Sequence, residues 1–121
     1  IAWVTRPDGY HEYYNPRWYE YTGLTEAESL GWGWATPLHP DDKARSEARW
    51  KQSTETGTEY EIEYRLRGAD GNYRWFLGRA LPQKDASGAI VRWFGTCTDI
   101  HEFRTLRDNL RASEERFRTL T

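Results

Sequence analysis

Residues 58–98 carry the strongest structural signal in the chain and read TEYEIEYRLRGADGNYRWFLGRALPQKDASGAIVRWFGTCT. Within residues 58–67, apolar side chains alternate with charged ones, so that Ile62, Tyr64 and Leu66 share one face. This period of two is typical of a strand that is buried on one side only. We therefore expect a half-buried strand here.

The rest of this stretch predicts two more strands, at 73–85 and 89–98, because both segments are rich in aromatic and β-branched residues. Glycine-containing turns at 69–72 and 86–88 are short enough to join neighbouring antiparallel strands. Together the three strands predict an antiparallel meander.

The residues before the meander predict a hairpin followed by helices. Strands are expected at 2–6 and 10–14, joined by the turn Pro7-Asp8-Gly9. Helices are expected at 16–22, 25–30 and 39–56, with an irregular segment at 31–38. The whole pattern predicts an α+β domain, in which helices cover one face of a five-stranded antiparallel sheet.

Capping residues mark the ends of the first two helices. Asn15 is placed to cap the first helix, with Pro16 at its first position and Gly23 after its last. Thr25 and Glu28 have the spacing of a capping box at the start of the second helix.

The length and composition indicate one small domain and argue against a nucleic-acid-binding protein and a membrane-spanning protein. The chain has 121 residues and a formal net charge of −2, which argues against a nucleic-acid binder, because such a protein needs a basic face. No apolar run approaches the roughly 20 residues that span a bilayer, so we expect no direct membrane contact. Cys97 is the single cysteine, which agrees with a reducing, cytoplasmic location. Because the chain begins at Ile1 without a methionine, we expect it to be part of a longer protein.

Residues 100–121 have a different character and predict a separate helix. Apolar residues recur there at alternating spacings of three and four, interrupted by one serine: Phe103, Leu106, Leu110, Ser113, Phe117 and Leu120. Such a narrow stripe favours pairing with a second helix in a coiled coil, and hence a homodimer, over folding back on the domain. We therefore expect a domain at 1–101 and a linking helix at 102–121.

Several short motifs occur in a fixed order along residues 1–101. They are Asn15-Pro16-Arg17-Trp18, Tyr21-Thr22-Gly23, Gly31, His39-Pro40-Asp41-Asp42, Asp70-Gly71, Arg74-Trp75 and Thr98-Asp99-Ile100. This ordered set resembles the PAS/PAC family, in particular the branch common in bacterial histidine kinases. The resemblance implies a PAS fold with helices that cup a pocket, frequent dimerisation and a regulatory role.

The same resemblance implies that the end of the last strand relays a signal to the helix that follows. The relay would lie at Asp99, Ile100 and His101, where family members often have Asp-Ile-Thr. Asp99 is placed to cap the helix, whereas the contact of the threonine hydroxyl is lost with His101.

Five residues are the best candidates to line a ligand pocket: Trp34, Tyr64, Phe76, Trp93 and Cys97. Strand alternation puts Cys97 on the same face as Val91, Trp93 and Gly95. The resemblance places Cys97 where related flavin-binding domains have a pocket-facing polar side chain, and the alternative is a buried small hydrophobe.

The inward face of residues 73–85 stays open at this stage. Trp75 and Leu77 alternate with Phe76 and Gly78, so either set could face the core. So many bulky rings could also fill the cavity completely.

No cofactor, metal site or catalytic group is predicted. Flavin photoreceptors of this fold resemble one another in an Asn-Cys-Arg-Phe segment, but residues 34–38 contain no cysteine, and residues 43–56 contain no histidine for an axial haem ligand. His39 with Asp41 and Asp42 reads as a helix start, because no second histidine or cysteine stands at ligand spacing. No phosphate-binding glycine loop or catalytic triad pattern occurs. Turn and surface roles fit the histidines, which are His11, His39 and His101.

The leading hypothesis is a sensory and dimerisation module of a sensor histidine kinase, which relays a signal through its C-terminal helix to an effector domain of the same protein. One alternative is a ligand-free spacer or protein-interaction domain, and another is the input domain of a diguanylate cyclase-type regulator. A cavity that can hold a small-molecule ligand favours sensing, and a solid core favours a spacer.

Overall fold

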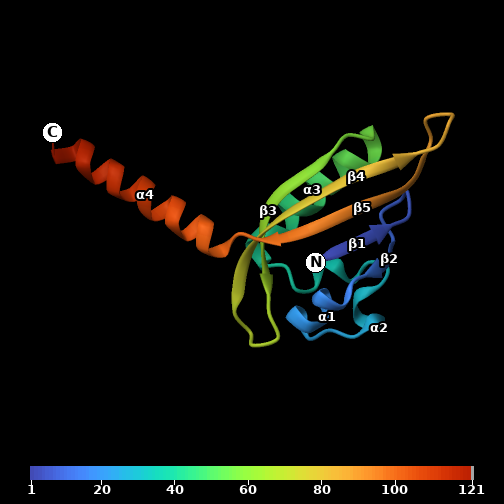
Figure 1. Ribbon diagram of the computed structural model, residues 1–121, viewed down its shortest axis with the longest axis horizontal. Coiled ribbons are helices and arrows are strands. Elements are labelled where there is room, and N and C mark those ends of the chain that lie inside the picture. Colours follow the sequence, from blue (N-terminus) through green and yellow to red (C-terminus); the bar gives the residue numbers. More distant parts are fainter. Residues whose placement is uncertain (121) are drawn as a thin grey trace.

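The computed structural model describes the backbone of residues 1–120 and the side chains of residues 1–118. The elements follow one another in the order β1 (Ala2–Thr5), β2 (His11–Tyr14), α1 (Pro16–Thr22), α2 (Glu26–Ser29), η1 (Gly33–Ala35), α3 (Pro40–Thr56), β3 (Tyr60–Arg67), β4 (Tyr73–Lys84), β5 (Ile90–Asp99) and α4 (His101–Leu120) (Figure 1). The α+β fold with its C-terminal helix, which the sequence predicts, is confirmed.

The five strands form one antiparallel sheet in the order β2-β1-β5-β4-β3. The first hairpin therefore joins the meander through the pairing of β1 with β5, which places Trp3 opposite Gly95. Within the meander, Gly78 of β4 lies opposite Cys97 of β5. The pairings β1–β2, β3–β4 and β4–β5 thus join strands that are consecutive in the chain, and the pairing of β1 with β5 links distant parts of it.

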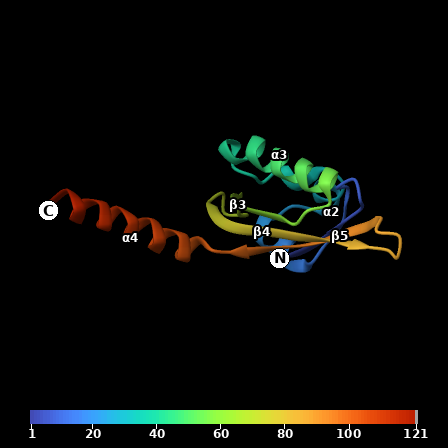
Figure 2. The ribbon, with the colours of Figure 1, turned by 90° about the horizontal axis from the view of Figure 1, so that it is seen from above.

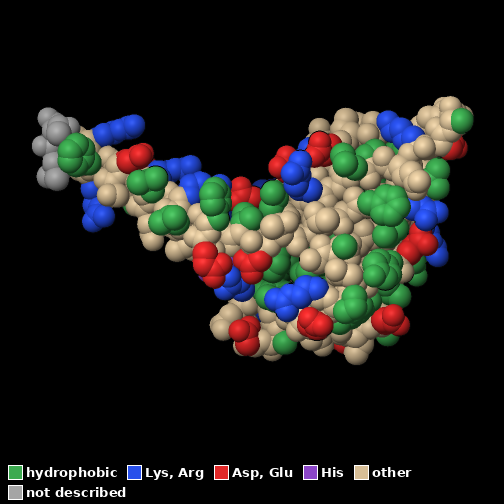
Figure 3. All heavy atoms as spheres, viewed as in Figure 1, with side chains coloured by type: hydrophobic (Ala, Val, Ile, Leu, Met, Phe, Trp, Pro, Cys, Tyr) green, Lys and Arg blue, Asp and Glu red, His purple; other side chains and the backbone are tan. Residues whose placement is uncertain are grey.

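Helix α3 lies across one face of the sheet (Figure 2). Its Trp50 ring packs edge-on against the rings of Trp3 and Tyr60, with centroids 5.5 and 5.0 Å away. The opposite face is uncovered (Figure 3), and Leu81 and Phe94 are exposed on it. The aromatic core therefore lies on one side of the sheet only.

The structure shows which face of β4 is inside. Phe76, Gly78 and Ala80 are buried, whereas Trp75 and Leu77 are only half-buried. Gly78 accounts for this choice, because a Cβ there would lie 2.5 Å from the hydroxyl oxygen of Tyr64.

Of the two predicted helix N-caps, the structure contains one as predicted and differs at the other. Glu28 and Thr25 form the predicted capping box, in which each side chain accepts a hydrogen bond from the backbone N–H of the other. The prediction for Asn15 is wrong in its detail, because its side chain makes no capping bond to α1. Its Oδ1 instead accepts the N–H of Ala2 at 3.0 Å, since the pairing of β2 with β1 brings that amide within reach.

The predicted strand bounds agree with the structure to within two residues. The largest difference is at β3, which begins at Tyr60. Gly57 ends α3 in the left-handed conformation, with φ of 71°, and the Thr58 hydroxyl bonds back to that of Thr56 at 2.7 Å. These contacts keep the first residues after the helix out of the strand.

Helix α4 leaves the sheet at its first residues and extends away from the domain (Figures 1 and 2). Four of its apolar residues are 59% to 72% exposed, namely Phe103, Leu106, Leu110 and Phe117. The described part of this stripe does not fold back on the sheet, and the side chain of Leu120 lies outside the described residues. Across residues 1–120, no helix is both long enough and apolar enough to cross a bilayer.

Replacing Gly95 with alanine should destabilise the domain, because the new Cβ would overlap ring atoms of the buried Trp3. We expect the free energy of unfolding to fall by about 1–3 kcal/mol, as measured by urea denaturation. Thr96→Ala, on the exposed side of the same strand, should cost about 0.5 kcal/mol or less. Equal losses in the two variants would show that the Trp3 ring is not the cause.

Candidate functional site

A small cavity lies between the sheet and the helices. Its walls come from strands and helices alike, and the lining residues are Trp3, His11, Tyr14, Trp18, Trp34, Leu38, Trp50, Tyr60, Tyr64, Leu66 and Cys97. Its volume is only about 20 Å³, which suits roughly one water molecule. Pockets for drug-sized ligands are far larger, at about 300–1,000 Å³. The aromatic rings thus fill most of the space that the fold encloses.

Three of the five residues proposed from the sequence lie in the cavity wall: Trp34, Tyr64 and Cys97. Phe76 and Trp93 do not, although both are buried. Phe76 packs against Tyr21, with ring centroids 5.0 Å apart, and Trp93 packs against Trp50 at 5.3 Å. Strand alternation puts Trp93 on the inner face with Cys97, whereas for Phe76 it left the face open, and it cannot tell how far along that face the cavity extends.

His11 is a cavity residue that sequence reasoning missed, because it was expected in a turn or on the surface. It is buried, and its ring stacks on Tyr14 with centroids 5.2 Å apart. Its backbone exchanges two hydrogen bonds with Gly31, at 2.9 and 2.8 Å, and this bridge holds the side chain inside. The sequence signal for its burial was its place within the strand predicted at 10–14.

The protonation state of His11 follows from these contacts. Its Nδ1 donates a hydrogen bond to the carbonyl oxygen of Gly9 at 3.1 Å, because a carbonyl can only accept. Burial lowers the pKa of His11 from 6.5 to about 4, although hydrogen bonds with the backbone of Gly9 and Gly31 act in the opposite direction. The imidazole is therefore neutral at physiological pH.

Cys97 and Tyr64 form a buried pair in the cavity wall. The Tyr64 hydroxyl lies 3.1 Å from Cys97 Sγ. Burial raises the pKa of the Cys97 thiol, although the contact with Tyr64 opposes this. Because the thiolate is the reactive form of cysteine, Cys97 here is a packed, weakly nucleophilic side chain.

Tyr14 adds a polar atom to the cavity wall. Its hydroxyl is buried and has no hydrogen-bond partner among the described residues, and burial raises its pKa well above the usual value. A buried hydroxyl without a partner costs about 1–3 kcal/mol, so this wall suits an ordered water better than an apolar molecule.

The cavity wall carries no charged side chain among the residues that line it. All of the lining side chains are neutral at physiological pH. No cluster of three metal-ligating side chains occurs in the part of the chain that the structure describes.

The proposed relay residues lie at the junction between β5 and α4. Asp99 accepts the N–H of His101 through Oδ1 at 2.9 Å and pairs with Arg74 Nε through Oδ2 at 2.7 Å. Partial burial would raise the pKa of Asp99, but hydrogen bonds from Arg74 and the His101 N–H hold it below its usual value. Arg74 also pairs with Glu102 at 2.6 Å. One arginine of β4 therefore binds both the cap and the first turn of α4.

His101 makes a contact of its own with β4. Its Nδ1 accepts the backbone N–H of Trp75 at 3.2 Å, and the Ile100 N–H donates to the Trp75 carbonyl oxygen at 2.9 Å. Both backbone groups of Trp75 are thus bound by the chain just after β5, so the first turn of α4 is fixed against β4.

The stability of the domain should depend on pH through His11. The unfolded chain takes up a proton below about pH 6.5, whereas the folded protein does so only near pH 4. Stability from this residue is therefore complete above pH 6.5 and is lost as the pH falls towards 4, by on the order of 3 kcal/mol. Urea denaturation of wild type and His11→Phe across this range would measure it. An undiminished pH dependence in the variant would assign the effect to other groups.

The thiol of Cys97 should react slowly with a thiol reagent in the native protein and quickly in denaturant, because it is buried and its pKa is raised. The reaction can be followed by absorbance of the released chromophore. Ser87→Cys, in an exposed turn, gives the matched control, in which one additional thiol reacts quickly without denaturant. Equal native and denatured rates for Cys97 would contradict its burial.

Curated relatives match most of the chain. The uncharacterized protein y4lL of Sinorhizobium fredii is 39% identical over 99% of the chain, and the peroxide stress-activated histidine kinase mak1 of Schizosaccharomyces pombe is 33% identical over 83% of it. The chain spans only 14% and 6% of the lengths of these two relatives.

Two solved structures with the same fold come from a histidine kinase and a diguanylate cyclase. A sensory box histidine kinase/response regulator from Burkholderia thailandensis is 29% identical, with a TM-score of 0.70 over 98% of this chain and 89% of that chain. The N-terminal domain of a diguanylate cyclase with PAS/PAC sensor from Marinobacter aquaeolei is 25% identical, with a TM-score of 0.75 over 85% and 96%.

The family described as PAS fold matches residues 11–97. These residues include β2, the helices over the sheet and nearly all of the meander. The match covers well over half of the chain and agrees with the strand order and with the relatives above. The chain therefore belongs to the PAS family of regulatory sensor domains.

Proposed function

We propose that this domain is the sensory and dimerisation module of a multidomain sensor histidine kinase, and that it passes changes in its own packing into a pair of α4 helices. The observation that carries the proposal is the contrast within α4. Its first turn is bound to β4 through Arg74 and His101, while its apolar stripe further along is exposed.

The exposed stripe supports pairing with a second copy of the chain. Phe103, Leu106, Leu110 and Phe117 repeat at heptad spacing and are 59% to 72% exposed. Large apolar side chains in such a row gain free energy when another helix removes them from water. Most of a helix's stability in a protein comes from packing of its apolar face, so pairing would depend on how the two domains present their helices. That dependence is what a relay requires.

The identity of the effector is part of the proposal. Proteins similar to this chain include histidine kinases from Schizosaccharomyces pombe and Burkholderia thailandensis, which favours a kinase. The Marinobacter structure favours the input domain of a diguanylate cyclase as the second candidate. In either case the partner is an effector domain of the same protein, and the single buried thiol of Cys97 supports a cytoplasmic location.

A ligand-free spacer remains the alternative from another class. The cavity volume of about 20 Å³ favours it, because no drug-sized ligand fits that space. The sensing proposal therefore includes signals that alter packing without a large bound molecule, such as a partner protein or a neighbouring domain.

Replacing Leu106 with glutamate should weaken dimerisation and leave the domain folded, because it puts a charge into the stripe and not into the core. Sedimentation velocity over a range of concentrations would measure the effect, with circular dichroism as the control for folding. Thr105→Glu adds the same charge beside the stripe, and this variant should sediment like wild type. If all three proteins sediment alike at every concentration, the helices do not pair and the proposed relay fails.

A further inference from the structure

Trp75 joins the exit helix to the sheet through its ring as well as its backbone. It lies on the face of the sheet away from the core, half-buried. The Cζ atom of Arg104, from α4, lies 3.5 Å from the centre of the ring, and that of Arg65, from β3, lies 4.8 Å away. Both distances are within the range of cation–π contacts, for which tryptophan is the best partner.

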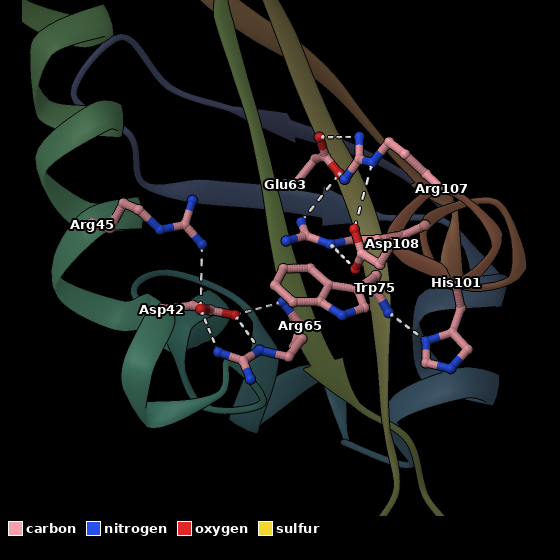
Figure 4. Close-up of polar contacts among 9 residues, drawn as sticks. Asp42, Arg45, Glu63, Arg65, Trp75, His101, Arg107 and Asp108 are labelled. Carbon is pink, nitrogen blue, oxygen red and sulfur yellow. Dashed lines mark hydrogen bonds and ion pairs between the residues drawn. The ribbon is translucent and has the colours of Figure 1, made fainter. Parts of the chain in front are cut away.

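Each of these two arginines has its own carboxylate, which offsets the repulsion between two cations at one ring. Arg65 binds Asp42 through Nε at 3.0 Å and Nη2 at 2.8 Å. Arg104 binds Glu63 at 3.2 Å. Figure 4 shows Asp42 and Arg65 on the α3 side of Trp75, with Glu63, Arg107 and Asp108 on the α4 side.

Asp42 fixes the start of α3 to β3. It is 3% exposed, and its Oδ2 also accepts the backbone N–H of Arg65 at 2.8 Å. Although burial alone would raise the pKa of Asp42, its contacts with Arg65 lower it to about 2. A buried carboxylate with three such bonds holds its partner in one geometry, because losing any of them leaves charge without compensation.

The same region also forms part of the cavity wall. Leu38 and Leu66 line the cavity and face each other in an isolated β-bridge, and the His39 N–H donates to the carbonyl oxygen of Arg65 at 3.0 Å. A shift of the cavity wall at Leu38 would therefore displace the start of α3 together with Asp42.

We propose that Asp42 and Arg65 act as positioning residues for the exit helix, and that they do so through the Trp75 ring and Arg104. The start of α3 and the docking of α4 on the sheet would then change together. This inference deepens the proposed relay and rests on it only in treating α4 as the output. It is separate from the Asp99 junction, because it reaches α4 one turn later and starts from the helical layer.

The distance between α3 and α4 within one chain tests the link directly. Spin labels at Glu47→Cys and Asn109→Cys, in a Cys97→Ser background, report it by double electron–electron resonance. Excess unlabelled chain restricts the measurement to single chains, whatever their state of association. Arg104→Gln removes the contact between Arg104 and the Trp75 ring and should broaden the distance distribution. Asp42→Asn should broaden it in the same way.

Two further variants make the test specific to the ring. Arg45 binds Asp42 at 3.3 Å and has no contact with Trp75 in the described structure, so Arg45→Gln should leave the distribution unchanged. Trp75→Leu should broaden it, and adding Asp42→Asn to Trp75→Leu should have no further effect. Arg65→Lys, which keeps the charge but loses the planar contact, should broaden it while circular dichroism shows an intact fold.

The proposal is overturned if Asp42→Asn, folded by circular dichroism, keeps the wild-type distribution while Arg104→Gln broadens it. It is also overturned if Asp42→Asn and Trp75→Leu have additive effects, because the two residues would then act independently. Neither outcome depends on whether α4 pairs, so a failure here is distinguishable from a failure of the dimer relay.

Discussion

The Trp3 ring packs directly over Gly95 in the neighbouring strand, at a position where a Cβ atom would overlap it. This close approach lets β1 insert between β2 and β5, so that the first hairpin and the meander form one sheet. Once β2 is in place, His11 and Tyr14 reach the inner face, and Trp50 of α3 packs over Trp3. The cavity wall at His11 and Tyr14 and the packing of α3 over β1 both depend on this contact between distant parts of the chain.

The interior has consequences for how such a domain can signal. Close-packed protein cores have low compressibility and transmit strain, and this cavity has room for about one water molecule. A shift of any lining ring therefore moves its neighbours. Two sets of contacts bind α4 to β4. One runs through Arg74, Asp99 and Glu102, and the other places Arg104 over the Trp75 ring, beside Arg65. Both reach β4 at adjacent residues, Arg74 and Trp75.

Residues in short-range contact were predicted well, and those whose role depends on distant partners were not. The capping box of Thr25 and Glu28 involves residues three apart and is present as predicted. Asn15 is a residue type that often caps helices, but its side chain bonds to Ala2, thirteen residues away. His11 looked like a turn residue, yet a bridge to Gly31 buries it. In each of the two misassigned cases, a partner distant in sequence decides where the residue lies.

By itself the sequence determined the order and type of the elements, the antiparallel meander and the apolar stripe of α4, because alternation, turn residues and heptad spacing act between near neighbours. Only the tertiary structure decided which face of β4 is inside, which rings line the cavity and which charges meet at Trp75. Those contacts join α3, β3, β4 and α4, and their geometry depends on the register of the sheet and on how α3 packs across it. The register between distant segments produces no periodic pattern in the sequence, so it is known only once the strands are paired.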